Sequence, residues 1–128
     1  MSFKVEFKNY LDDLHKSLCE VSDWMYENPE LGFQEFKTSK HLVDYIQKNS
    51  KSVNYPSHGL ETAFDVTFGD DGPLVVIGVE YDALPEIGHA CGHHIIATAS
   101  IGAGLGLKDI ASKLGIRVKL LGTPAEEG

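Results

Sequence analysis

The sequence predicts an α/β fold, and three observations support this. Residues 74–79 form a continuous apolar run and residues 116–121 form a second apolar segment, and both have the length expected of strands. Between them, residues 95–114 are rich in Ala, Ile, Leu and Gly and are long enough for a helix. Strand, long helix and strand in this order form a βαβ unit, in which the two strands are parallel. We therefore expect a parallel pair of strands with a helix packed against it.

Two amphipathic helices are expected before this unit. Apolar residues recur at steps of three and four between residues 3 and 25, which places them on one face of a helix. Asn28-Pro29 ends this helix, because the residue before a proline is pushed out of the helical region. Residues 30–36 should turn, with Gly32 in a special backbone conformation. A second helix is expected from about residue 35 to residue 48. Its expected buried side consists of Phe36, Leu42, Val43 and Ile46.

The remaining elements follow from composition. A loop is expected at residues 49–57 and a tight turn at residues 69–73. Between them, a half-buried or edge strand is expected at residues 60–68. The apolar run at 74–79 is typical of a strand covered on both faces. We expect Gly102, Gly104 and Gly106 to let the long helix pack closely on the sheet. Gly115 should then end that helix.

Length and charge limit the possible functions. A chain of 128 residues fits one domain, residues 1–128. The net charge of −8 argues against nucleic acid and anionic membranes as partners. The sequence shows no secretory signal and no apolar stretch approaching the ~20 residues of a spanning helix, so a cytoplasmic location is expected. Of the two cysteines, Cys19 is expected to be buried or half-buried in the first helix.

Three groups of metal-type side chains follow the predicted elements. Glu80 and Asp82 come directly after the first apolar strand, the sequence HACGHH occupies residues 89–94, and Glu126-Glu127 come after the second strand. Carboxyl ends of parallel strands meet at one edge of a sheet, where ligands bind in open α/β folds. Thiolate, imidazole and carboxylate groups together are typical zinc ligands. We therefore predict a metal-dependent hydrolase.

Each group alone has an ordinary explanation. Cys-x-His can be a buried thiol beside a surface histidine, Glu-Glu can be a solvated turn, and Asp82 can cap a loop. Their convergence on one sheet edge favours the metal site. A different possibility is a thiol-dependent hydrolase, with Cys91 as nucleophile and His93 or His94 as base. The acidic pair would have no role in that mechanism.

The segments EYDALP, GHACGHH and LLGTPAEEG resemble the amidohydrolase branch of the M20 zinc peptidase family. The segment MYENPELGFQEFKTSKHLVDYI also resembles the N-terminal part of that family. The similarity extends over residues 22–128 and is strongest to dipeptidase-like and aminobenzoyl-glutamate hydrolase-like members. It implies a three-layer α/β/α catalytic domain that hydrolyses a small N-acyl amino acid, dipeptide or related amide.

The resemblance also implies a two-metal site, with zinc or manganese. By position, Cys91, His93 and Glu127 match metal ligands, Glu126 matches the general base, and Asp82 matches the aspartate that supports a ligand. His94 stands where the family usually has Asp or Asn, and we expect it to donate a hydrogen bond within its loop. His89 is expected to be structural or to support a ligand.

Family members continue well past the Glu-Glu motif. They supply further histidine ligands, a lid or dimerisation domain and more of the catalytic sheet. The resemblance therefore implies that residues 1–128 are an N-terminal part with little or no activity, in which the strand after Ile116 is an exposed edge. A complete protein of this type is expected to form a homo-oligomer. The alternative is a non-catalytic product that binds metal or a full-length partner subunit.

Overall fold

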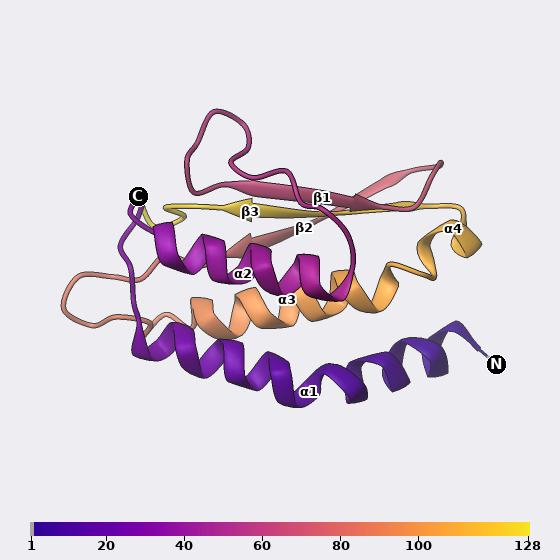
Figure 1. Cartoon of the computed structure of the whole chain (residues 1–128), viewed down its shortest axis with the longest axis horizontal. Coiled ribbons are helices and arrows are strands. Elements are labelled where there is room, and N and C mark those ends of the chain that lie inside the picture. Colours follow the sequence, from indigo (N-terminus) through magenta and orange to yellow (C-terminus); the bar gives the residue numbers. More distant parts are fainter. Residues whose placement is uncertain (1) are drawn as a thin grey trace.

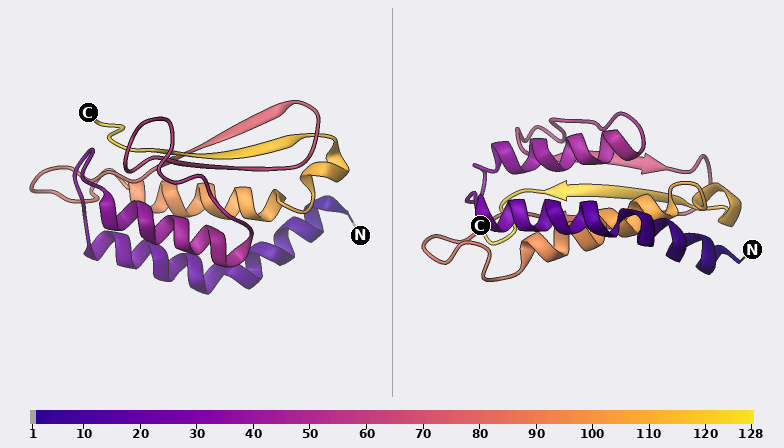
Figure 2. Two further views of the ribbon diagram at one scale, coloured as in Figure 1. Left: turned by 45° about the horizontal axis from the view of Figure 1, so that its top comes forward. Right: turned by 60° about the horizontal axis from the view of Figure 1, so that its bottom comes forward.

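The computed structural model describes residues 2–128 as an α/β fold, which confirms the predicted class. The elements, in chain order, are α1 (Phe3–Glu27), α2 (Phe36–Asn49), β1 (Phe64–Phe68), β2 (Leu74–Glu80), α3 (His93–Leu107), α4 (Ala111–Leu114) and β3 (Arg117–Thr123). The three strands form one sheet in the order β1-β3-β2. The three long helices lie on one face of this sheet (Figure 1). The left view in Figure 2 shows the same two layers. Of the three layers that the resemblance implies, residues 2–128 thus form the sheet and one helical layer.

The central strand β3 aligns the ends of its two neighbours. β2 pairs with β3 in parallel, from Leu74 opposite Arg117 to Glu80 opposite Thr123. The predicted parallel pair is therefore confirmed. β1 pairs with β3 in antiparallel orientation and, as expected for an edge strand, lies at the side of the sheet. Because Glu80 and Thr123 are register partners, the loops that follow β2 and β3 start side by side.

Three expectations about the strands are wrong. β2 is not covered on both faces, because Leu74, Val75 and Val76 remain 41%, 46% and 51% exposed. The strand after Ile116 is not an edge strand, since β3 lies between the two edge strands β1 and β2. A continuous apolar run identifies a strand but does not specify which neighbours cover it. β1 is also shorter than residues 60–68, because residues 61–62 form a turn and the strand begins at Phe64.

The helix α1 begins at a capping residue and ends at Glu27, directly before Asn28-Pro29, which confirms its predicted end. The Ser2 hydroxyl accepts a hydrogen bond from the Val5 amide at 3.2 Å, as an N-cap residue does. Among the described residues, no helix is long and apolar enough to cross a membrane. Cys19 is exposed on this helix, so its expected burial is wrong.

The turn before α2 and the start of that helix differ from expectation. Phe33, and not Gly32, adopts the left-handed conformation, with φ +62°. Gly32 is required for a close approach instead, because a Cβ atom there would lie 3.0 Å from Ala125 Cβ. Phe36 is exposed, whereas the side chain buried at this end of the helix is Glu35. Apolar periodicity could not identify a buried carboxylate at this position.

The predicted helix at 95–114 is two helices separated by a turn at residues 108–110. Gly104 packs on the sheet as expected, since a Cβ atom there would lie 2.5 Å from Leu120 Cδ2. Gly102 and Gly106 instead face side chains of α1, so the expectation for these two glycines is wrong. Gly115, with φ +69°, ends α4, which confirms its predicted role.

Candidate metal centre

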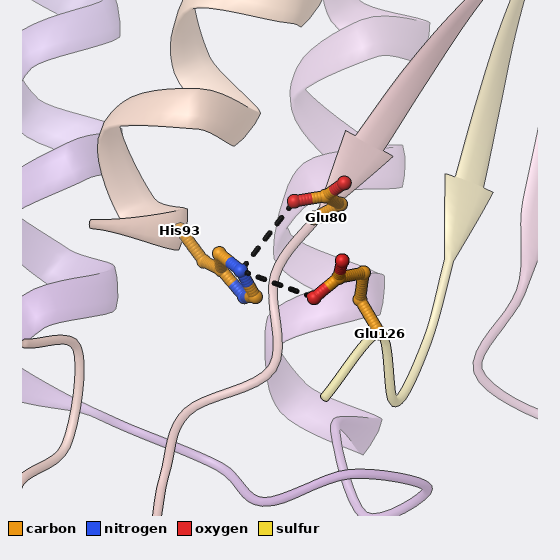
Figure 3. Close-up of side chains that lie close together, drawn as sticks. All are labelled: Glu80, His93 and Glu126. Atoms are coloured by element: carbon orange, nitrogen blue, oxygen red, sulfur yellow. Dashed lines mark ion pairs between the residues drawn. The ribbon is translucent and has the colours of Figure 1, made fainter. Parts of the chain in front are cut away.

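The predicted metal-type side chains lie together at the carboxyl ends of β2 and β3. Glu80 is the last residue of β2, and His93 is the first residue of α3. Glu126 and Glu127 lie in the loop after β3. Figure 3 shows Glu80, His93 and Glu126 pointing toward one another from these three segments. The sheet register thus brings together residues that are far apart in the sequence.

The imidazole of His93 is the centre of this cluster and is only 4% exposed. Its Nδ1 atom lies 2.8 Å from the backbone carbonyl oxygen of Asp82. Because a carbonyl oxygen can only accept, Nδ1 carries the hydrogen atom. In the neutral ring, Nε2 then carries the lone pair. One nitrogen is therefore used for anchoring, and the other is available to a ligand.

The Nε2 atom of His93 faces three carboxylates. It lies 3.4 Å from Glu80 Oε2, 3.7 Å from Glu126 Oε2 and 3.6 Å from Glu127 Oε1. The nearby Glu80 carboxylate is the largest cause that raises the pKa of Glu126, followed by burial and by Glu127. A cation in this position would relieve the repulsion between these groups.

The donor atoms fit a divalent metal ion. One atom each of Glu80, His93 and Glu126 lie within 4.8 Å of one another, so that a single ion could contact all three. Imidazole nitrogen and carboxylate oxygen are ordinary zinc ligands. The sequence places Glu80 in the acidic group but indicates no role for it. Its place at the end of a strand that runs parallel to β3 is the signal that could have identified it.

Asp82 connects the imidazole to the acidic loop. Its Oδ1 atom lies 3.0 Å from His93 Nδ1, and its Oδ2 atom accepts a hydrogen bond from the Glu127 amide at 3.0 Å. The Nδ1 hydrogen points to the backbone carbonyl, so Oδ1 remains without a hydrogen-bond partner among the described residues. The carboxylate is buried. It can therefore fix both His93 and the loop that carries Glu126 and Glu127.

Cys91 is exposed at the edge of the cluster, two residues before His93. Desolvation and the negative charge of Glu127 raise the pKa of Cys91. This environment does not favour the thiol-dependent alternative, because a nucleophilic thiolate needs a neighbour that lowers its pKa. Cys91 and Glu127 thus lie next to each other, adjacent to the triad of Glu80, His93 and Glu126.

The two other histidines of the motif lie beside the cluster. His89 is buried, and neither of its ring nitrogens has a hydrogen-bond partner in the described part of the chain. Its ring centroid lies 5.5 Å from that of His94, which in turn lies 5.3 Å from that of Tyr26. The buried Nδ1 atom of His94 is also without a partner among residues 2–128. These rings pack on one another near the end of α1.

No family model matches the chain, but several known proteins are similar to it, and those named below are hydrolases of peptides or related amides. The chain is 34% identical to a mouse Xaa-Arg dipeptidase, over 91% of this chain and 30% of that protein. It is 27% identical to one of the subunits of p-aminobenzoyl-glutamate hydrolase from Escherichia coli, over 96% of this chain and 30% of that protein. The chain therefore spans about a third of the length of these curated relatives.

A solved structure shows the same fold. It is a dinuclear metal-binding peptidase of the M20 family from Bacillus subtilis. The two structures superpose with a TM-score of 0.76 at 26% identity. The match covers 91% of this chain and 36% of the bacterial one.

Proposed function

This chain belongs to the M20 family of metallopeptidases and amidohydrolases, and on that premise we propose that it carries part of a metal site that hydrolyses small amides. The observation that carries the proposal is the orientation of His93. Its Nδ1 atom is anchored on Asp82, while its Nε2 atom faces three carboxylates.

The proposed metal ligands are Cys91, His93 and Glu127, with Glu80 as a further carboxylate beside them. Thiolate and imidazole favour zinc, and manganese is the second choice for a site rich in carboxylates. When bound, such an ion polarises an amide carbonyl and lowers the pKa of a water molecule toward neutrality.

Glu126 is the proposed general base. Its carboxylate lies 3.7 Å from His93 Nε2 and is exposed enough for a substrate to reach it. In this proposal, Glu126 accepts the proton of the attacking water and delivers it to the leaving amine. Asp82 keeps His93 in the required tautomer and direction.

The substrate class follows from the relatives. A dipeptidase and an aminobenzoyl-glutamate hydrolase both act on an amide with an amino acid on one side. We therefore propose a dipeptide or N-acyl amino acid as the substrate. We also propose the cytoplasm as the location. The chain spans only about 30% of the length of its relatives. A complete catalytic unit in the whole protein, and its assembly as a homo-oligomer, are therefore also part of the proposal.

A non-catalytic metal-binding chain is the second candidate. The exposed apolar residues of the edge strand β2 favour it, because such an edge can pair with another strand. Both candidates predict zinc binding, but only the first predicts turnover.

The experiment that separates them compares the zinc-loaded chain with its Glu126→Gln variant on a panel of dipeptides and acetylated amino acids. Weak hydrolysis that Glu126→Gln abolishes, with zinc content unchanged, supports the hydrolase. Zinc binding without turnover, together with capture of a full-length partner subunit by the chain, supports the second candidate. Absence of zinc binding by a folded chain contradicts both.

A further inference from the structure

Glu35 is a fully buried carboxylate outside the proposed metal site. It precedes the first residue of α2, and its side chain is 0% exposed. Its Oε2 atom accepts a hydrogen bond from the Ala125 amide at 2.7 Å. Its Oε1 atom accepts a longer one from the Thr62 hydroxyl at 3.4 Å. The 2.7 Å contact connects the start of α2 to a residue 90 positions later in the chain.

The surroundings of Glu35 are unfavourable to a carboxylate. Burial is the largest cause that raises the pKa of Glu35, and the negative charge of Asp82 raises it further, while the Ala125 hydrogen bond lowers it. A buried acid next to a second acid destabilises a fold relative to an apolar side chain of similar volume. General stability therefore does not explain this side chain.

The residue that Glu35 contacts is itself held in a special conformation. Ala125 adopts a φ of +54°, in the left-handed region that non-glycine residues rarely occupy. The Glu35 segment also approaches it closely at Gly32, where a Cβ atom would lie 3.0 Å from Ala125 Cβ. The segment before α2 thus contacts the loop after β3 at two points, one polar and one apolar.

Glu35 and Asp82 together hold alternate amides of this loop. Glu35 accepts from Ala125, and Asp82 accepts from Glu127 at 3.0 Å. Glu126 lies between these two fixed amides, with its carboxylate toward His93. The direction of the Glu126 side chain is therefore determined by two buried carboxylates from different parts of the chain.

We infer that Glu35 is a positioning residue, which fixes the Ala125 amide so that Glu126 and Glu127 face His93. The claim that this contact serves metal binding rests on the proposed function. The claim that Glu35 fixes the Ala125 amide does not depend on that function. The two parts can be measured separately.

The test uses the full chain and three main variants. Glu35→Gln keeps an oxygen that can accept from the Ala125 amide, while Glu35→Met keeps the volume without an acceptor. Asp65→Ala is the matched control, because Asp65 is also buried and accepts from Ser57 and Asn54 but not from the loop after β3. The first readout is hydrogen exchange of single amides by NMR. The second is Co²⁺ affinity, followed by the thiolate and ligand-field absorption bands.

In Glu35→Met, we expect exchange of the Ala125 and Glu127 amides to accelerate at least about tenfold relative to the Leu120 amide. Co²⁺ affinity should fall by about 10-fold or more. Glu35→Gln should restore both, and Asp65→Ala should leave both unchanged when its lower stability is taken into account. If Glu35→Met does not fold, Gly32→Val replaces it, because its side chain would displace Ala125 with Glu35 intact.

Unchanged Ala125 exchange in Glu35→Met overturns the inference, as does equal acceleration in Asp65→Ala. Failure of Glu35→Gln to restore the exchange would also overturn it. If the unsubstituted chain does not bind Co²⁺, the proposed function fails, but the exchange measurement still decides whether Glu35 holds the loop.

Discussion

His93 and Asp82 contact each other through two different oxygens of the aspartate. The Nδ1 atom of His93 lies 2.8 Å from the Asp82 backbone carbonyl oxygen and 3.0 Å from its side-chain Oδ1. This double contact attaches the first residue of α3 to the loop that leaves β2. It also determines which ring nitrogen carries the hydrogen atom, and therefore directs the lone pair of Nε2 toward the carboxylates.

Replacement of Asp82 tests this arrangement. In Asp82→Ala, the Glu127 amide loses its acceptor and His93 loses its carboxylate neighbour, although the backbone contact remains. Zinc affinity should fall by about 10- to 100-fold, as is usual when a partner of a metal ligand is removed. Competition with a chromophoric chelator measures this loss. The exposed Asp71 supplies the control, since Asp71→Ala should bind zinc as the unsubstituted chain does. Equal affinities for both variants would contradict the role of Asp82.

Zinc should protect one of the two cysteines from alkylation. Both thiols are exposed, but only Cys91 lies near Glu127, two residues before His93, whereas Cys19 is on α1. A thiolate bound to a metal reacts more slowly with iodoacetamide, so Cys91 should be protected while Cys19 serves as an internal control. Mass spectrometry of peptides from the alkylated chain measures both rates. Equal rates at Cys91 with and without zinc would exclude it as a ligand.

The close contact between α3 and the sheet predicts a large effect for a small substitution. A Cβ atom at Gly104 would lie 2.5 Å from Leu120 Cδ2 and 2.6 Å from its Cγ, and Leu120 is fully buried. Gly104→Ala should therefore lower the free energy of unfolding by about 1–3 kcal/mol. Gly78 in β2 has nothing within 4 Å of the same position, so Gly78→Ala should be neutral or slightly stabilising. Urea unfolding compares the two variants, and equal losses would contradict this packing.

The buried carboxyl of Glu35 predicts a pH-dependent difference in stability. Burial and the Asp82 charge raise the pKa of Glu35 above its ordinary value of 4.5. Above that value, the unfolded chain releases a proton that the folded chain still retains, so this group lowers the free energy of unfolding as pH rises. Glu35→Gln has no such proton to release. It should therefore be more stable than the unsubstituted chain near neutral pH, and the difference should disappear below about pH 4. A difference that is constant over this range would contradict the raised pKa.

The predictable features are those that depend on local pattern. Two apolar runs and the helix between them were sufficient to predict the parallel pairing of β2 and β3, and this pairing brings Glu80 and the loop after Thr123 together. The exposure of Leu74, Val75 and Val76 was not predictable, because it depends on the strand order and on which faces the helices cover.

The contacts that fix the acidic loop could not be predicted from the sequence either. Glu35 looks like a solvated residue next to an apolar Phe36, but the fold buries Glu35 and exposes Phe36. The hydrogen-bond partner of Glu35 is a backbone amide, which has no signature in the side-chain pattern. Gly32 was recognised as special, although its role is close contact with Ala125 and not a left-handed backbone.

His93 Nε2 is expected to bind a metal ion at this sheet edge. The most direct measurement is the zinc content of the purified chain after equilibrium dialysis, determined by elemental mass spectrometry, beside His93→Gln and Cys91→Ala. We expect about one zinc or more per chain, a large loss in both variants, and unchanged circular dichroism. A folded chain that retains no zinc, or a His93→Gln variant that retains as much as the unsubstituted chain, would contradict this expectation.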